Sequence, residues 1–405
     1  MLKEYLDCGH SPYHVVSKVT QSLQNAGFKG VSLGDIKELR GGNYYLTVND
    51  TTLFALRIPE GKRKTLRIIT AHTDYPCFKI KPVADMAQCG NCNKINVEKY
   101  GGMLARTWFD RPLGISGAIW TRGVDEFNPV MKLVDIDRPV CLIPSLAPHM
   151  DREIENRKIN EQKELIPVTG LADGRSIMKL ISEEAGCDEG DILSYDLNLF
   201  NWEKAVVVGN DGELIMGQGI DNIASVAAAT QAFTENSNLA DDGCVSIMCL
   251  FDNEEIGSRT RQGADSTVLA RVIDMLNVSI EEGIIISADG AHGVHPNYPE
   301  KSDPVATAEM GKGLVIKTSA SMRYATEGKT LAIIKGICEE RNISYQIQAN
   351  RSGAPGGSTL GPIVSSHIPI AAADVGIPML AMHSACECAA MFDYRSLVKF
   401  IKAVI

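Results

Sequence analysis

A mostly apolar run from Val245 to Phe251 reads V-S-I-M-C-L-F and is followed at once by D-N-E-E-I-G-S. Such a run, bounded by a turn-like sequence, predicts a buried strand. In an open α/β sheet, ligands bind outside the carboxyl ends of the strands, which is where Glu254 and Glu255 would lie. Side chains of successive residues diverge, so one carboxylate could bind a metal ion while its neighbour accepts a proton. A solvated acidic loop is the alternative, because most Asp and Glu side chains are exposed.

Other ends of apolar strands in the sequence carry metal-binding side chains, and so does the start of an Ala-rich helix; these residues are His72, Asp221, Asp289 and His383. With Glu255 they supply two imidazoles and three carboxylates. A pair of divalent ions about 3.5 to 4 Å apart needs such a set if one carboxylate bridges them. Asp221 lies outside a strand and is the predicted bridge, although a plain helix cap is the alternative for this residue.

Glu254 is left as the predicted general base. A water bound to the metal ions loses a proton near neutral pH and can attack a carbonyl; Glu254 would take that proton and pass it to the departing amine. Asp74 follows His72 by two residues, so its carboxylate can bond the far ring nitrogen and orient the imidazole. Asp252 is expected to support the turn and to stay outside the metal set.

The charge balance argues against nucleic-acid binding, since 50 acidic and 40 basic residues among 405 give a net charge of −10. No apolar run approaches the roughly 20 residues that span a membrane, and the first residues lack the apolar core of a signal peptide. We therefore expect no membrane association and a cytoplasmic location.

The cysteines form an odd set of 11 at irregular spacings, which favours reduced thiols over a disulfide framework. Cys89 and Cys92 form a C-x-x-C pair, but no second pair completes a four-thiolate zinc site. Structural or incidental thiols are the expected reading of this pair, with a metal or redox role as the alternative.

The texture of the sequence changes twice. Residues 83–211 contain short β-like runs between Gly, Pro and Asp turns, which predicts a β-rich insertion. We expect it to interrupt an α/β domain made of residues 1–82 and 212–405. Residues 2–27 carry apolar side chains at helical spacing and are predicted to form helix.

Six segments together resemble the aspartyl aminopeptidase family of dizinc peptidases over residues 72–384: A-H-T-D-x-P-x-F-K-I-K-P, D-N-x-A-S-V, D-N-E-E-I-G-S, S-A-D-G-A-H-G-V-H-P-N-Y-P-E-K, G-G-S-T-L-G-P and G-I-P-M-L-A-M-H-S. The resemblance implies an α/β mixed-sheet metallopeptidase domain with helices on both faces, interrupted by a β-rich dimerisation domain. It also implies a tetrahedral homododecamer built from dimers. Two divalent ions per subunit are implied, zinc being expected and cobalt or manganese the alternatives.

The implied substrates are short peptides with a free N-terminus, preferably beginning with Asp or Glu. The resemblance further implies that a neighbouring subunit lends His149 to the substrate, and that His292, Lys317 and Tyr324 contact it. Cys386 stands where relatives often carry a basic residue. An aminopeptidase of the same chemistry with neutral or broad preference is therefore one alternative, and a non-catalytic assembly protein is another.

Overall fold

The computed structural model describes residues 1–154, 156–235, 243–354 and 356–405, which divide into two units. The first unit consists of Met1–Tyr75, Ala205–Met382 and Glu387–Ile405. The second unit consists of Pro76–Lys204 and His383–Cys386.

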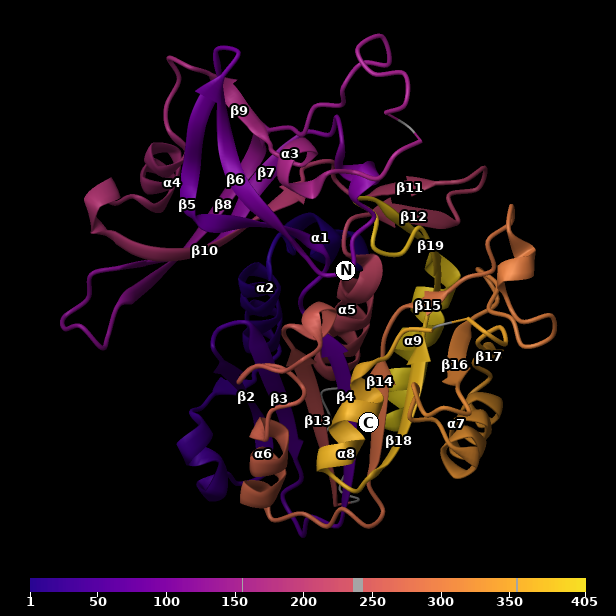
Figure 1. The fold of residues 1–405 in the computed structure, drawn as a ribbon. Coiled ribbons are helices and arrows are strands. Elements are labelled where there is room, and N and C mark those ends of the chain that lie inside the picture. The colour runs from indigo at the N-terminus through magenta and orange to yellow at the C-terminus, as the bar shows by residue number, and fades with distance from the viewer. Residues whose placement is uncertain (155, 236–242, 355) are drawn as a thin grey trace. The chain divides into compact units, whose positions relative to one another are not determined.

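A nine-stranded mixed sheet forms the centre of the first unit (Figure 1). Its four middle strands run parallel, and antiparallel pairs flank them on both sides. The middle strands are rich in apolar residues, as expected for strands buried on both faces, although β4 also carries Thr, Arg and His. In spatial order the strands are β1 (Lys29–Gly30), β2 (Gly42–Val48), β3 (Thr52–Ile58), β13 (Cys244–Phe251), β4 (Thr65–His72), β14 (Ile284–Ala288), β18 (Ala371–Gly376), β16 (Leu314–Thr318) and β17 (Tyr345–Ala349).

Helices cover both faces of this sheet, which confirms the predicted α/β class. One face packs against helices that include the Ala-rich α5 and the C-terminal α9; small alanine side chains let α5 lie close to β4. The other face packs against a second group of helices around an apolar core. The first group is α1 (Leu2–Cys8), α2 (Pro12–Asn25), α5 (Ile220–Glu235), α7 (Gly328–Glu340) and α9 (Met391–Val404); the second is the 3₁₀ helix η1 (Leu33–Glu38), α6 (Val268–Leu276) and α8 (Leu360–His367).

The N-terminal segment forms two helices, α1 and α2, where the sequence predicted helix throughout residues 2–27. Ser11 caps α2, since its side chain accepts a hydrogen bond from the His14 N–H at 3.4 Å. Pro12 occupies the first turn, where its missing N–H costs nothing. The apolar residues keep helical spacing from α1 into α2, so this spacing does not reveal the break between the helices, which Ser11 and Pro12 mark.

The first unit also contains a smaller five-stranded sheet, and several of its strands lie close in sequence to predicted metal ligands. Its strands, in spatial order, are β11 (Val206–Val208), β12 (Leu214–Gly217), β20 (Glu387–Ala390), β19 (Pro378–Leu380) and β15 (Ala291–His292). Because β11 and β12 pair in this sheet, the first unit resumes at Ala205.

The second unit contains a six-stranded antiparallel sheet. Its first strand, β5, runs through residue 83, so the unit begins at Pro76, earlier than the expected boundary. Cys89 and Cys92 are paired residues at the β5–β6 turn, and both thiols are free. The spatial order is β8 (Val130–Cys141), β7 (Leu113–Thr121), β10 (Ile192–Asn201), β5 (Cys77–Cys89), β6 (Cys92–Tyr100) and β9 (Val168–Leu171), with helices α3 (Glu161–Glu164) and α4 (Ile177–Ala185).

Candidate active site

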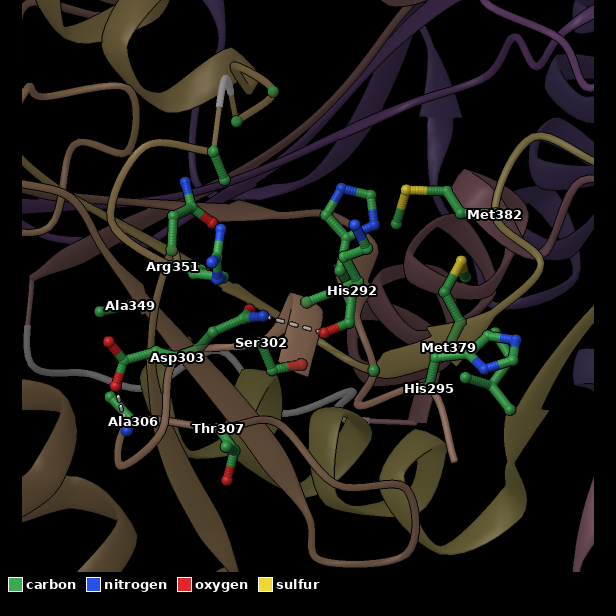
Figure 2. A pocket seen from close by; sticks show the side chains of 18 of the residues that line it. His292, His295, Ser302, Asp303, Ala306, Thr307, Ala349, Arg351, Met379 and Met382 are labelled. Atoms are coloured by element: carbon green, nitrogen blue, oxygen red, sulfur yellow. Dashed lines mark hydrogen bonds between the residues drawn. The ribbon is translucent and has the colours of Figure 1, made fainter. Parts of the chain in front are cut away.

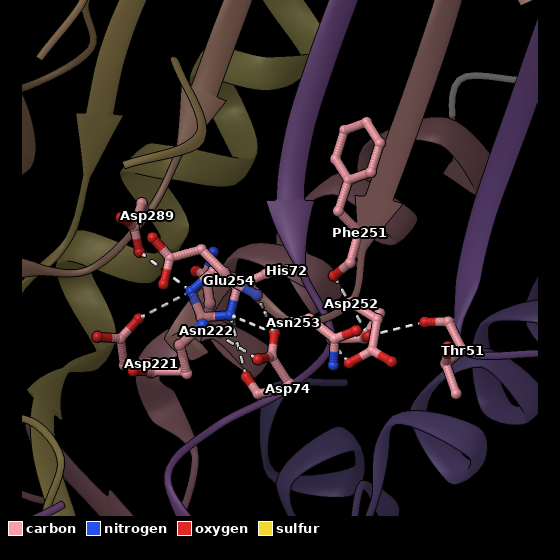
Figure 3. Close-up of polar contacts among 12 residues, drawn as sticks. Thr51, His72, Asp74, Asp221, Asn222, Phe251, Asp252, Asn253, Glu254 and Asp289 are labelled. Carbon is pink, nitrogen blue, oxygen red and sulfur yellow. Dashed lines mark hydrogen bonds and ion pairs between the residues drawn. The ribbon is translucent and has the colours of Figure 1, made fainter. Parts of the chain in front are cut away.

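The carboxyl ends of three parallel strands lie level with one another and bring polar side chains together (Figure 3). Phe251, the last residue of β13, pairs with His72 at the end of β4. On the other side of β4, Ser287 pairs with Thr70, which places Asp289 level with His72. The imidazole therefore lies between the turn that follows β13 and the carboxylate that follows β14.

His72 is the centre of this cluster and is fully buried. Its Nε2 atom lies 3.5 Å from Asp221 Oδ1 and 3.4 Å from Asp289 Oδ1. Its Nδ1 atom lies 3.0 Å from the Asp74 carbonyl oxygen, to which it donates, and 3.3 Å from Asp74 Oδ1. Asp74 thus fixes the ring so that Nε2 points at two carboxylates.

This donor set fits a divalent metal ion. Two ligands of a tetrahedral zinc lie about 3.4 Å apart, given zinc distances of 2.0 to 2.1 Å, and the separations from His72 Nε2 match that spacing. Ligand atoms of His72, Asp221 and Asp289 all lie within 4.8 Å of one another, and so do those of His72, Glu254 and Glu255. A metal-binding imidazole usually donates its other N–H to a carboxylate or carbonyl, as His72 does.

The turn after β13 is fixed by Asp74. The Glu254 N–H donates to Asp74 Oδ1 and the Glu255 N–H to Asp74 Oδ2, both at 3.1 Å. Asn253 adopts a left-handed conformation with φ of 64°, which asparagine tolerates better than most residues. Asp252 accepts a hydrogen bond from the Asn253 N–H at 2.7 Å. One buried carboxylate therefore orients both His72 and the two glutamates.

Asp221 is held by contacts that the sequence did not indicate. Its N–H donates to Glu387 Oε2 at 2.9 Å, and Glu387 is buried on β20. The next residue, Asn222, donates from Nδ2 to the Ala288 carbonyl at 2.9 Å, which ties Asp221 to the end of β14. A Cβ atom at Gly290 would lie 3.1 Å from the Asp221 carboxyl carbon, so a side chain there would crowd the site. The sequence signal for Glu387 is a carboxylate at the start of a short apolar strand, β20.

Burial and mutual repulsion separate the acids of the cluster. Burial, with the nearby negative charges, raises the pKa of Glu254 to about 8, although His72 opposes the shift. Burial and then the Asp221 charge raise the pKa of Glu255 well above its usual range. Burial also disfavours ionised Asp289, but the Lys317 ammonium and the contacts with His72 and Asp221 together outweigh burial and lower the pKa of Asp289. Groups whose pKa values are pushed apart in this way are typical of acid–base sites.

Lys317 is close to Asp289 and is 1% exposed. Its Nζ donates to the Gly290 carbonyl at 2.8 Å and lies 3.6 Å from Asp289 Oδ2. The ring of Tyr324, which is also buried, has its centroid 5.2 Å from this nitrogen. Burial alone would lower the pKa of Lys317, but Asp289 and the other acidic groups around it together raise that pKa, so the side chain stays cationic. The positive charge of Lys317 is thus already used to hold Asp289.

Three histidines remain among the predicted site residues. His292 is on β15, is exposed, and lines a cavity (Figure 2). His149 and His383 belong to the second unit. His149 is exposed, while the Nδ1 atom of His383 lies 3.1 Å from the Gly102 carbonyl oxygen. The roles of these three histidines stay predictions.

The helices within the described part of the chain include none that is both long and apolar enough to cross a membrane.

Known proteins resemble the chain in sequence and in structure. Residues 5–404 match the family described as aminopeptidase I zinc metalloprotease (M18). A protein of Clostridium acetobutylicum named probable M18 family aminopeptidase 2 is 36% identical over 409 residues, which cover 96% of this chain and 94% of that protein. The crystal structure of prApe1 has a TM-score of 0.94 at 26% identity and covers 100% of this chain and 93% of its own. The mApe1 dodecamer of S. cerevisiae has a TM-score of 0.86 at 25% identity and covers 99% and 94%.

The family match covers nearly the whole length, and a relative that is 36% identical aligns with 96% of the chain. The chain belongs to the M18 family of zinc metalloproteases and is a metalloaminopeptidase.

Proposed function

We propose that the chain is a dinuclear aminopeptidase with one metal ion held by His72, Asp221 and Asp289. The observation that carries this proposal is that His72 Nε2 lies within 3.5 Å of both carboxylates while Asp74 holds the opposite ring nitrogen. Asp221 would be shared with a second ion bound by Glu255 and His383. Zinc is the metal of the family, and cobalt or manganese would suit the same N/O donors.

When bound, the ions supply Lewis acidity, which makes a water molecule acidic near neutral pH and polarises the scissile carbonyl. Glu254 would accept the proton of that water and deliver it to the departing amine. Its half-buried carboxyl has a pKa of about 8, and a group whose pKa lies near the working pH can both take up and release a proton. Asp74 would be a positioning residue, because it orients His72 and the Glu254 amide.

The proposed substrates are short peptides with a free N-terminus whose first residue is Asp or Glu. Neutral or broad preference is the alternative, since Cys386 stands where relatives often carry a basic residue. The reaction class rests on the family, whereas the preference rests on the resemblance in the six sequence segments.

A profile over N-terminal residues tests this preference. The metal-loaded protein should release Asp and Glu from otherwise identical peptides at least about tenfold faster, in kcat/KM, than Ala or Leu, because one hydrogen-bonded charge in the site is worth that much. Acetylated peptides should stay intact. Equal rates on all first residues would favour the broad alternative, and cleavage of acetylated peptides would rule out an aminopeptidase.

Assembly into a tetrahedral homododecamer built from dimers is also proposed, with the second unit as the dimerisation domain and His149 reaching the substrate of a neighbouring subunit. The similarity to a yeast protein solved as a dodecamer supports it. Apolar side chains on the second unit are almost fully exposed, with Val124 at 94% and Phe127 at 93%. Light scattering after gel filtration should give twelve subunit masses; a stable monomer would contradict the assembly.

A further inference from the structure

The preference for acidic substrates, on which this inference rests, needs a positive charge that can reach the first residue of the peptide. Lys317 is poorly suited to supply it. Its Nζ is buried, donates to the Gly290 carbonyl and neutralises Asp289. A substrate carboxylate would have to compete with Asp289 for the same ammonium. A cation elsewhere in the first unit would avoid that competition.

A cavity of about 450 Å³ in the first unit offers such cations (Figure 2). Its lining includes Lys301 and Arg351, together with the imidazole of His292. Neither Lys301 nor the Arg351 guanidinium forms a hydrogen bond or ion pair through its side chain with any residue that the structure describes. Two cationic side chains thus line one hollow without an anion to balance them.

The one carboxylate in the described lining does not neutralise this charge. Asp303 Oδ1 accepts hydrogen bonds from the Val305 N–H at 3.0 Å and the Ala306 N–H at 2.8 Å. These donors lower the pKa of Asp303, so it stays ionised and bound to its own loop. Lys301 and Arg351 carry two positive charges and Asp303 carries one negative charge, so the cavity has a net positive charge that attracts an anion.

The cavity adjoins the metal ligands. Met382, which lines it, has its methyl carbon 3.1 Å from the position that a Cβ at Gly290 would occupy. The carboxyl carbon of Asp221 lies 3.1 Å from that same position. His292, on another part of the lining, follows the ligand Asp289 by three residues. A peptide whose first carbonyl is next to Asp221 could therefore place a side chain in this cavity.

We propose that Arg351 binds the carboxylate of the N-terminal Asp or Glu side chain, with Lys301 adding positive charge to the same cavity. A hollow of about 450 Å³ also admits neutral side chains, so size cannot select acidic ones and charge must do so. The guanidinium is suited to this task because its planar fork donates two parallel hydrogen bonds to a carboxylate.

The experiment compares wild type and Arg351→Ala on peptides that differ only in the first residue. For Asp and Glu, kcat/KM should fall about tenfold or more, mainly through KM, because a charge-assisted contact is lost. For Ala and Leu it should stay unchanged. Arg351→Lys should retain part of the preference, and Arg351→Glu should raise the relative rate on Lys peptides. Arg341→Ala, at an exposed arginine outside the lining, is the matched control and should change neither class.

The outcomes separate this inference from the function on which it rests. If the wild type shows no acidic preference, both the preference and the role of Arg351 are wrong. If the wild type prefers acidic residues and Arg351→Ala keeps the same ratio, only the role of Arg351 is wrong. An equal loss on acidic and neutral peptides in both the Ala and the Lys variant would assign Arg351 a structural role and would also overturn the inference.

Discussion

Glu254→Gln is expected to lower kcat by about 10³-fold while the bound metal stays unchanged. Glutamine keeps the shape of the side chain but cannot accept the proton of the attacking water. The Glu254 N–H would still donate to Asp74, so the turn after β13 should keep its conformation. The measurement is kcat on a peptide that the wild type cleaves, with metal content from inductively coupled plasma mass spectrometry.

Glu255→Gln is the matched control, since it makes the same chemical change at the adjacent residue. It should lose metal and activity together, because Glu255 is a proposed ligand. Retention of activity by Glu254→Gln would exclude Glu254 as the base. Metal-loaded wild type without turnover on any peptide that has a free N-terminus would instead favour the non-catalytic assembly protein.

Removal of the metal should abolish activity and lower the Tm by at least about 5 °C at pH 8. Without a cation, the clustered carboxylates of Asp221, Glu255 and Asp289 must either repel one another or take up protons. Dialysis against a chelator, followed by thermal unfolding with and without added zinc, measures the effect. Apo and zinc-loaded protein that unfold at one temperature would contradict a metal site in this cluster.

The pH dependence of that Tm difference has a definite sign. The pKa of Glu254 is raised to about 8 and that of Glu255 is raised as well, so the protonated forms favour the folded apo protein. This contribution is complete below the unfolded pKa near 4.5 and is lost as the pH rises through about 8. Asp289, with its lowered pKa, contributes constantly above pH 4.

Consequently, the gap between holo and apo protein should widen from pH 6 to pH 8. Bound metal ions replace the protons in the holo form, and weaker proton competition strengthens metal binding as the pH rises. Thermal unfolding of both forms at these two pH values measures the gap. A difference in Tm that narrows toward pH 8 would show that metal binding does not displace protons from the carboxyls of Glu254 and Glu255.

The middle of the fold could be predicted because its signals are local and strong. The run before Glu254 is apolar at nearly every position, as expected for a strand buried on both faces. Once such strands run parallel, their carboxyl ends meet at one edge, so His72 and Asp289 are expected at the same edge, and the pairing of β4 with β14 places them next to each other. The length of each strand mattered little to that inference.

Contacts that hold these residues could not be predicted, because their partners are distant in the sequence and carry no pattern. The hydrogen bond from Asp221 to Glu387 spans 166 residues. The engagement of Lys317 by Asp289 and the Gly290 carbonyl depends on burial that no spacing reveals. The change in sequence texture at residue 83 does not coincide with the start of the second unit, because β5 begins at Cys77 and continues through residue 83.

The level ends of β13 and β4 limit where this chain can tolerate insertions and deletions. Phe251 pairs with His72, and side chains along a strand alternate between the two faces. One residue added within β4 would shift the register and turn His72 toward the opposite face of the sheet. Homologues of different length should therefore differ in the connecting loops, while the distance in residues from the start of β4 to His72 stays fixed.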